Sequence, residues 1–153
     1  DLLYVSEDAQ IGYPPVRLMS PPDMQWQTWY LGFRKAMEAL LTGDAMTGIE
    51  AVDSGFANKA FSVNELDDEV TAIAARIAKI PSDLLALNKR SVHRAMEAMG
   101  VREGIRATAE IQALGFHQKS SKEYMKRFKD EGVSKTLSDR DKPFGDYREK
   151  DSK

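Results

Sequence analysis

The chain opens with one strand-like apolar run and then turns almost entirely to helical patterns. The run is Leu2–Val5, within DLLYVSED, and its apolar and aromatic composition predicts a strand buried on both faces. Residues 9–12 offer at most one further short strand. A sheet usually needs three or more strands to be stable. Since the chain also lacks an initiating Met, we expect a fragment whose missing strands come from residues before Asp1 or from another chain.

A proline-rich segment follows, IGYPPVRLMSPPD, which spans residues 11–23 and holds four of the six prolines. Each proline removes a backbone donor and biases the residue before it toward an extended conformation. Residues 13–22 are therefore predicted to form a fixed, extended loop. Asp23 then has the position of an N-cap for a helix over residues 24–31, which Gly32 would break.

Helical patterns occupy the chain from there to Gly132. A helix over residues 33–42 carries an apolar stripe that we interpret as core packing, and Gly43 ends it. Thr47 and Glu50 have capping-box spacing for a short helix that stops at Gly55. Residues 56–61 then predict a short strand or connector. The apolar stripe of the helix over residues 33–42 consists of Ala36, Met37, Leu40 and Leu41. Further helices are predicted over residues 64–81, 82–99, 102–116 and from near Ser121 to Gly132.

Composition narrows the class of protein. With 42% hydrophobic and 30% charged residues the chain should fold as a globular protein. A net charge of -2 argues against general binding to nucleic acid or anionic membranes. The absence of cysteine is typical of a cytoplasmic protein, and only two histidines, His93 and His117, make a metal site improbable. No apolar run approaches the length of a membrane span.

Three stretches resemble a known family in their order and spacing. They are DLLYVSEDAQIGYP, GFRKAMEALLTGDAMTGIEAVDSGFANKAF and LALNKRSV. Together they resemble the second half of the crotonase superfamily, the enoyl-CoA hydratase and isomerase enzymes, with Phe56 where Leu is usual. The resemblance implies an α/β fold of repeated ββα turns. Residues 1–61 would be the last part of that spiral, residues 62–132 a helical oligomerisation region that builds trimers or dimers of trimers, and residues 133–153 a polar tail. We expect this tail to be partly mobile unless Phe144 and Tyr147 dock.

The resemblance also implies a chemistry. Two backbone amides polarise the thioester carbonyl of an acyl-CoA and stabilise an enolate, while carboxylates move protons at nearby carbons. Those amides and most of the CoA-binding surface belong to the first half of the family's fold, so this chain by itself would not hold that site. No cofactor is expected, because coenzyme A is part of the substrate.

The proline-rich segment departs from the family's pattern at a catalytic position. In hydratases the stretch that resembles residues 11–15 ends in a catalytic Glu, and here Pro15 has that place. Proline has no titratable group, so hydration by two glutamates is in doubt. Asp23, eight residues further on, resembles a functional Asp of the family's dienoyl-CoA isomerase and 4-chlorobenzoyl-CoA dehalogenase members. It is our candidate catalytic residue, alongside its interpretation as a helix cap.

Several other residues are candidates with competing interpretations. Tyr13, Pro15, Met19 and Trp26 would line the acyl pocket, although core or trimer packing is the alternative for the two aromatic residues. Arg17 would bind a substrate anion or, by the simpler interpretation, form a structural ion pair. His93 is expected to be structural or surface-exposed. On the last helix Lys126, Arg127 and Phe128 are candidates for contact with CoA, or else part of a solvated face.

Two functions therefore remain open at the level of sequence. The first is an enoyl-CoA hydratase/isomerase-like enzyme that acts on an acyl-CoA thioester by enolate stabilisation, with an isomerase, hydrolase or similar activity favoured over standard hydration. The second is a non-catalytic oligomerisation or interaction module that lacks the half with the oxyanion hole.

Overall fold

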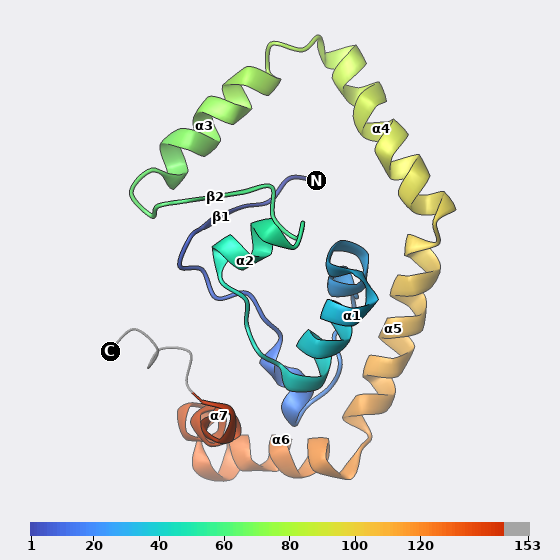
Figure 1. Cartoon of the computed structure of the whole chain (residues 1–153). Helices are drawn as coiled ribbons and strands as arrows, with labels where there is room; N and C mark the ends of the chain where they lie inside the picture. The colour runs from blue at the N-terminus through green and yellow to red at the C-terminus, as the bar shows by residue number, and fades with distance from the viewer. Residues whose placement is uncertain (146–153) are drawn as a thin grey trace.

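The computed structural model describes residues 1–145 and consists of a small parallel sheet surrounded by helices (Figure 1). The predicted mixture of a sheet end and a helical region is confirmed. In chain order the elements are β1 (Tyr4–Ser6), η1 (Pro14–Arg17), α1 (Trp26–Thr42), α2 (Gly48–Asp53), β2 (Lys59–Phe61), α3 (Leu66–Ile77), α4 (Ser82–Ala98), α5 (Val101–Phe116), α6 (Lys119–Glu131), α7 (Val133–Asp141) and η2 (Lys142–Phe144).

The sheet joins β1 to β2 in parallel, with Tyr4 opposite Lys59 and Ser6 opposite Phe61. The short helix α2 lies in the connection between these strands and packs against β1 at backbone distance. A Cβ on Gly48 would stand 1.9 Å from the carbonyl oxygen of Ser6, so only glycine fits there. Thr47 and the following turn form the predicted capping box. We name β1 together with α2 and β2, residues 4–6 and 48–61, the β1–α2–β2 unit.

The first strand is less enclosed than predicted. It begins at Tyr4, its three residues are half-buried, and Leu2 is exposed, so the prediction of a strand buried on both faces is wrong for this structure. Among residues 1–145 the sheet has only two strands. Ile11 forms a single antiparallel bridge with Met46 where a second short strand was expected.

The proline-rich segment is fixed but not extended. Pro14 and Pro15 open the 3₁₀ helix η1, because a backbone angle φ near -65° suits that helix as well as an extended chain. The N-cap prediction for Asp23 is also wrong: α1 begins at Trp26, with Gln25 at the N-cap position. The predicted break at Gly32 is confirmed, since its φ of 71° and ψ of 166° kink α1.

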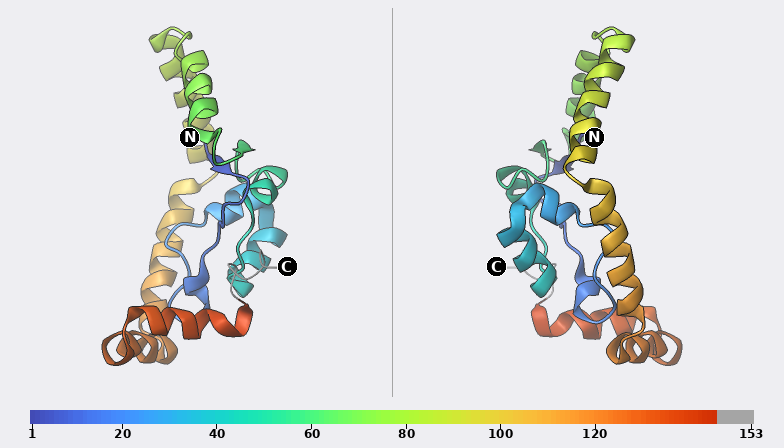
Figure 2. Two further views of the ribbon diagram at one scale, coloured as in Figure 1. Left: turned by 90° about the vertical axis from the view of Figure 1, so that its left-hand side faces the viewer. Right: turned by 90° about the vertical axis from the view of Figure 1, so that its right-hand side faces the viewer.

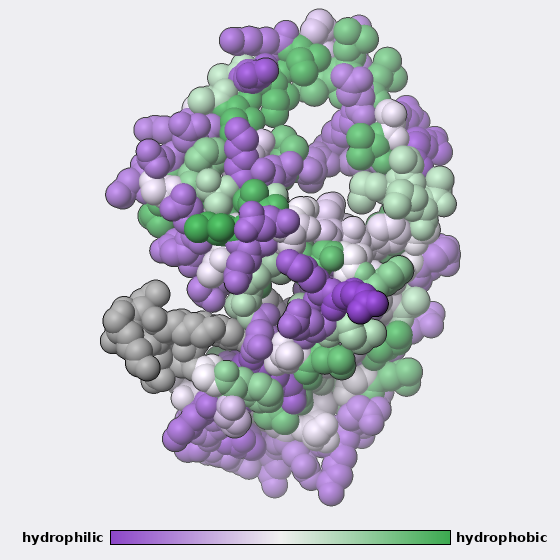
Figure 3. Space-filling model, viewed as in Figure 1, coloured by the Kyte–Doolittle hydropathy of each residue, from purple (hydrophilic) through white to green (hydrophobic). Residues whose placement is uncertain are grey.

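Helices α3 and α4 rise from the sheet as an arch, which we call the α3–α4 arch (Figure 1; Figure 2 shows it from the two sides). No residue of either helix is buried in the described structure. Apolar side chains gather at its surface, as the space-filling view shows (Figure 3). The apolar stripe of α1 is only partly core: Ala36 is buried, but Met37 and Leu41 are exposed, which corrects the core interpretation for these two.

The last helices form a corner at the other end of the molecule (Figure 1). Helix α6 begins two residues earlier than predicted, at Lys119, and ends before Gly132 as expected. The segment predicted to be turn-rich forms helix α7 instead, because buried Thr136 and Arg140 anchor it. Phe144 docks on Arg17, whose guanidinium carbon lies 4.2 Å from the ring centroid. Tyr147 lies outside the described residues.

Candidate functional site

A cavity of about 260 Å³ lies between the proline-rich segment, α1 and the loop after α2. It brings together three of the predicted site residues, Tyr13, Asp23 and Trp26, from positions that the sequence separates. Pro15 and Met19 are not among the residues that line it. The full lining is Ile11, Gly12, Tyr13, Pro22, Asp23, Met24, Trp26, Gln27, Ala39, Met46 and Phe56.

The wall of the cavity is mainly apolar and aromatic. Trp26 packs against Tyr30 with ring centroids 6.1 Å apart, and Tyr30 meets the edge of Phe56 at 6.0 Å. Met24 and Met46 add flexible thioether side chains, which adapt to irregular apolar groups. Such a wall suits an acyl chain, because binding pockets are generally apolar with a few polar groups that orient the ligand.

Asp23 supplies the one carboxylate among the lining residues. Within residues 1–145 this carboxylate has no hydrogen bond and no ion pair. It therefore does not cap a helix, and Gln25 is at the N-cap position of α1. The backbone carbonyl of Asp23 is held instead, by the hydroxyl of Thr108, which donates at 2.6 Å. Asp23 is thus an exposed residue of the cavity lining whose backbone is anchored.

Gln27 lines the cavity as well and was missed from the sequence. Its Oε1 is buried and has no hydrogen-bond partner among the described residues. A signal for it was present, because Asp23 and Gln27 are four residues apart at a predicted helix start and such residues share one face. This spacing was not used because Gln27 carries no charge and belongs to no motif.

Pro15 has a structural role in the segment beside the cavity. Its carbonyl oxygen accepts hydrogen bonds from the amides of Met19 at 2.8 Å and Ser20 at 3.2 Å, which close the turn after η1. Its ring carries no proton to transfer. The carboxylate at the cavity is thus contributed eight residues later, by Asp23.

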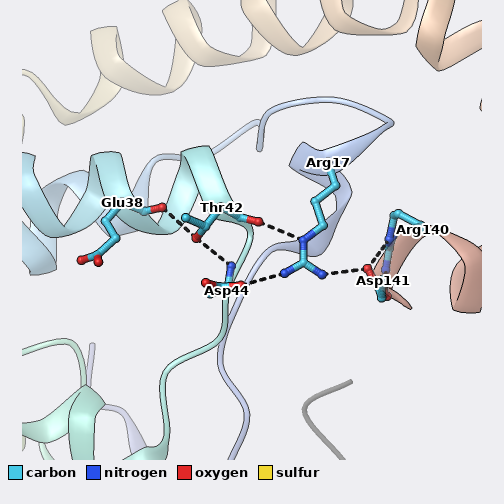
Figure 4. A network of polar contacts seen from close by, with 6 residues as sticks. All are labelled: Arg17, Glu38, Thr42, Asp44, Arg140 and Asp141. Carbon is cyan, nitrogen blue, oxygen red and sulfur yellow. Dashed lines mark hydrogen bonds and ion pairs between the residues drawn. The ribbon is translucent and has the colours of Figure 1, made fainter. Parts of the chain in front are cut away.

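Arg17 stands at the centre of a network of polar contacts (Figure 4). Its guanidinium donates to the carbonyl of Thr42 at 2.9 Å, to Asp44 at 2.9 Å and to Asp141 at 3.0 Å, and its side chain is only 1% exposed. Burial would raise the pKa of Asp141, but hydrogen bonds from Arg140 and Arg17 outweigh it and hold that pKa below its ordinary value. The simpler interpretation of Arg17, a structural ion pair, is confirmed.

The three candidates for CoA contact lie on α6, at the lower corner of Figure 1. Arg127 donates to Glu131 at 2.8 Å and to Asp139 at 2.6 Å. Phe128 packs against Tyr124 with centroids 4.9 Å apart, and Lys126 is exposed. Their contact with CoA stays a prediction. Arg127 already joins α6 to α7 through Asp139, and Phe128 packs within α6.

A second cavity of about 260 Å³ lies behind Ala39 and Met46, which line both cavities. Its remaining lining is more charged and includes Lys35, Glu38 and Glu50. Because Glu50 is engaged in the capping box of α2, part of this lining already has a structural role. None of the predicted site residues lies there, so the first cavity is the better candidate.

Neither a metal site nor a membrane span is found in the described part of the chain. Across residues 1–145 there is no group of three or more His, Asp or Glu side chains arranged to hold a metal ion. No helix in this range has the length and apolar character required to cross a bilayer. His93 contacts Asp1 at 2.8 Å on the surface, as expected.

Comparison with known proteins gives consistent results. Residues 1–135 match the sequence model of the family described as enoyl-CoA hydratase/isomerase. The protein named "Probable enoyl-CoA hydratase, mitochondrial" of Dictyostelium discoideum is 32% identical over 131 residues, which cover 84% of this chain and 47% of that protein. The mitochondrial enoyl-CoA hydratase of Pongo abelii is 30% identical, with 84% and 45% covered.

Solved structures agree with this result. The crystal structure of an enoyl-CoA hydratase from Mycobacterium smegmatis superposes with a TM-score of 0.92 at 28% identity, over 96% of this chain and 50% of that one. The chain thus spans about half the length of the relatives it matches. From the family match and from these likenesses, the chain belongs to the enoyl-CoA hydratase/isomerase family.

Proposed function

We propose that this chain forms the C-terminal half of an enzyme that acts on an acyl-CoA thioester by stabilising an enolate, with Asp23 as the group that transfers the proton. The observation that carries the proposal is a cavity whose lining combines a single carboxylic residue, Asp23, with apolar residues such as Trp26 and Phe56. Family membership supplies the substrate class.

The chemistry follows from the placement of one acid-base group beside an acyl chain. In the proposed reaction the Asp23 carboxylate removes a proton from a carbon adjacent to the conjugated system of an enoyl thioester. The electron pair of the broken C–H bond is delocalised onto the thioester carbonyl oxygen. Backbone amides from the other half of the enzyme stabilise that oxygen. The same carboxyl then returns the proton to a different carbon, so that the double bond shifts and no atoms are gained or lost.

Isomerisation is favoured over hydration for a specific reason. Hydration through two carboxylates uses one acid for the attacking water and one for the substrate carbon, whereas the described residues of this half contribute only Asp23 to the lining of the cavity. At the position that resembles the family's second acid the chain has Pro15, whose carbonyl is occupied by the turn after η1. A single carboxylate that takes up and returns one proton is sufficient for a double-bond shift.

The test is the Asp23→Asn substitution in the natural protein that contains this chain, assayed against a panel of enoyl-CoA thioesters of different chain length. We expect kcat to fall by about 100-fold or more, because general acid-base groups contribute on the order of 10²–10⁴-fold. Asp8→Asn is the matched control, since Asp8 is also exposed but lies outside the cavity. Rates within a few-fold of the wild type for Asp23→Asn would refute the assignment.

A second function is favoured by the apolar side chains at the surface, namely a non-catalytic module for oligomerisation. Phe33 is 82% and Leu41 76% exposed, and both belong to α1. An assembly of three or six copies would cover such faces. We also propose that the protein is located in the cytoplasm. If the natural protein assembles normally but turns over no member of the thioester panel, this second function replaces the first.

A further inference from the structure

We propose that Thr108 of α5 is a positioning residue that holds Asp23 at the cavity. This inference rests on the proposed function, because it concerns the geometry of the same carboxylate. The two residues are 85 positions apart in the chain and meet because α5 runs beside the loop that precedes α1 (Figure 2). Thr108 is not among the residues that line the cavity, so in this proposal it acts only through Asp23.

The contact is a short hydrogen bond inside the protein. The hydroxyl of Thr108 donates to the backbone carbonyl of Asp23 at 2.6 Å, and Thr108 is 5% exposed. Two carbonyls of its own helix are alternative acceptors, those of Gly104 at 2.9 Å and Ile105 at 3.1 Å. A hydroxyl has one proton to donate, and the distance to Asp23 is the shortest of the three. The geometry therefore favours the bond across the interface over the bonds that a helical threonine can form within its own helix.

Two glycines of α5 lie on either side of Thr108, Gly115 against the same loop and Gly104 against Trp29 of α1. A Cβ on Gly115 would stand 3.0 Å from Cδ of Pro21 and 3.1 Å from Cβ of Ser20, so the helix approaches the loop as closely as glycine allows. At the other end, a Cβ on Gly104 would make an ordinary contact of 3.8 Å with the indole of Trp29. Thr108 lies between these two glycines, one turn from Gly104 and two from Gly115, and supplies the directional bond.

The consequence for Asp23 follows from the absence of other restraints. Its carboxylate has no partner within residues 1–145, and α1 begins three residues later, at Trp26. The residues around Asp23 form a bend without regular hydrogen bonding. The Thr108 hydroxyl thus fixes the backbone from which the carboxylate projects. An error of about 1 Å in the position of a catalytic group lowers a rate by up to roughly 100-fold.

A matched pair of variants tests the contact itself. Thr108→Val has the same shape without the hydroxyl, whereas Thr108→Ser keeps the hydroxyl and loses a methyl group. We expect amide hydrogen exchange in the peptide covering residues 18–27 to be faster in Thr108→Val and unchanged in Thr108→Ser. Exchange in the peptide covering residues 47–61 reports whether the variants are folded. Equal exchange at residues 18–27 in Thr108→Val and the wild type would overturn the proposal.

A double-mutant cycle tests whether the contact serves the reaction. In the natural protein we expect Thr108→Val to lower kcat about 10-fold with KM changed less than about twofold, and Thr108→Ser to retain wild-type kcat. In the Asp23→Asn background Thr108→Val should have no further effect, because its role passes through Asp23. An equal loss in both backgrounds refutes positioning while leaving Asp23 as the acid. An active Asp23→Asn variant refutes the proposed function instead.

Discussion

In the β1–α2–β2 unit the chain packs against itself at backbone distance, whereas the α3–α4 arch holds its apolar side chains at the surface. Ala51 of α2 is completely buried, and Gly48 approaches the carbonyl of Ser6 more closely than any other residue type allows. On the arch Leu84 is 52% and Leu87 61% exposed. The unit thus has its own packed centre, while the arch has no buried residue and its helix α4 reaches the N-terminus through contacts of Lys89 and His93 with Asp1.

The difference shows which part of the molecule depends on what surrounds it. Each square ångström of apolar surface removed from water contributes about 25 cal/mol, and the arch leaves much of that contribution unrealised. Its helices form through periodic sequence patterns and first-turn acidic residues, such as Asp67 and Asp83, rather than through burial. Substitutions in the unit should therefore change folding, and substitutions on the arch should change association.

The largest effect is expected from Gly48→Ala. The new Cβ would lie 1.9 Å from the Ser6 carbonyl oxygen, so α2 must move away from β1. We expect the free energy of unfolding to fall by about 3 kcal/mol or more, measured by urea denaturation. Gly104→Ala is the control, because its Cβ meets an ordinary contact of 3.8 Å and alanine favours a helix by about 0.5–1 kcal/mol. An undiminished stability of Gly48→Ala would break the comparison.

An intermediate effect on stability is expected when the pH is lowered, at the corner formed by α6 and α7. This corner has charged contacts, whereas the arch has apolar side chains at its surface. Hydrogen bonds from Arg127 and Lys135 lower the pKa of Glu131 to about 2 from its usual 4.5. Because this pKa is lower in the folded state, the stabilisation is fully present above pH 4.5 and is lost as the pH falls through 2.

The stability difference between the wild type and Glu131→Gln should therefore shrink between pH 4.5 and 2, as followed by circular dichroism with denaturant. The side chain is at the surface, so added salt should also reduce the difference. A difference that stays constant over this range would show that the corner is held by packing alone.

The smallest effect on folding is expected from Leu87→Lys on the arch. Leu87 is exposed, so the free energy of unfolding of the isolated chain should change by less than about 0.5 kcal/mol. Sedimentation should show weaker self-association if this face is covered in an assembly. A loss of more than about 1 kcal/mol at low protein concentration would mean that the arch is packed within one chain, and the contrast with the β1–α2–β2 unit would disappear.

Local sequence signals predicted the local structure well. Thr47 and Glu50 are three residues apart and form the expected capping box, and Gly32 kinks α1 where the pattern breaks. These features depend on contacts within a few residues. Tyr13 and Trp26, which the family resemblance singled out, both line the cavity, and their contact with an acyl chain stays a prediction.

Features decided by distant residues could not be predicted. Asp23 has a residue type and a position that favour an N-cap. In the structure the Thr108 hydroxyl donates to the carbonyl of Asp23, and α1 starts later, at Trp26. Segment 133–141 has a polar, turn-like sequence, but it forms α7 because it packs on α6 and Asp141 reaches Arg17. Nothing in the spacing of these residues shows which of them meet, since the contacts span 85 and 124 positions.

The hydrogen bond from Arg17 to Asp141 can form only late in the synthesis of the chain. The two residues are 124 positions apart, and ribosomes add about 5–20 residues per second, so roughly 6–25 s pass between the synthesis of one and of the other. Until then the guanidinium reaches Thr42 and Asp44 but not α7. The loop that borders the cavity thus receives the restraints from Asp141 of α7 and Phe144 of η2 only after both have been translated.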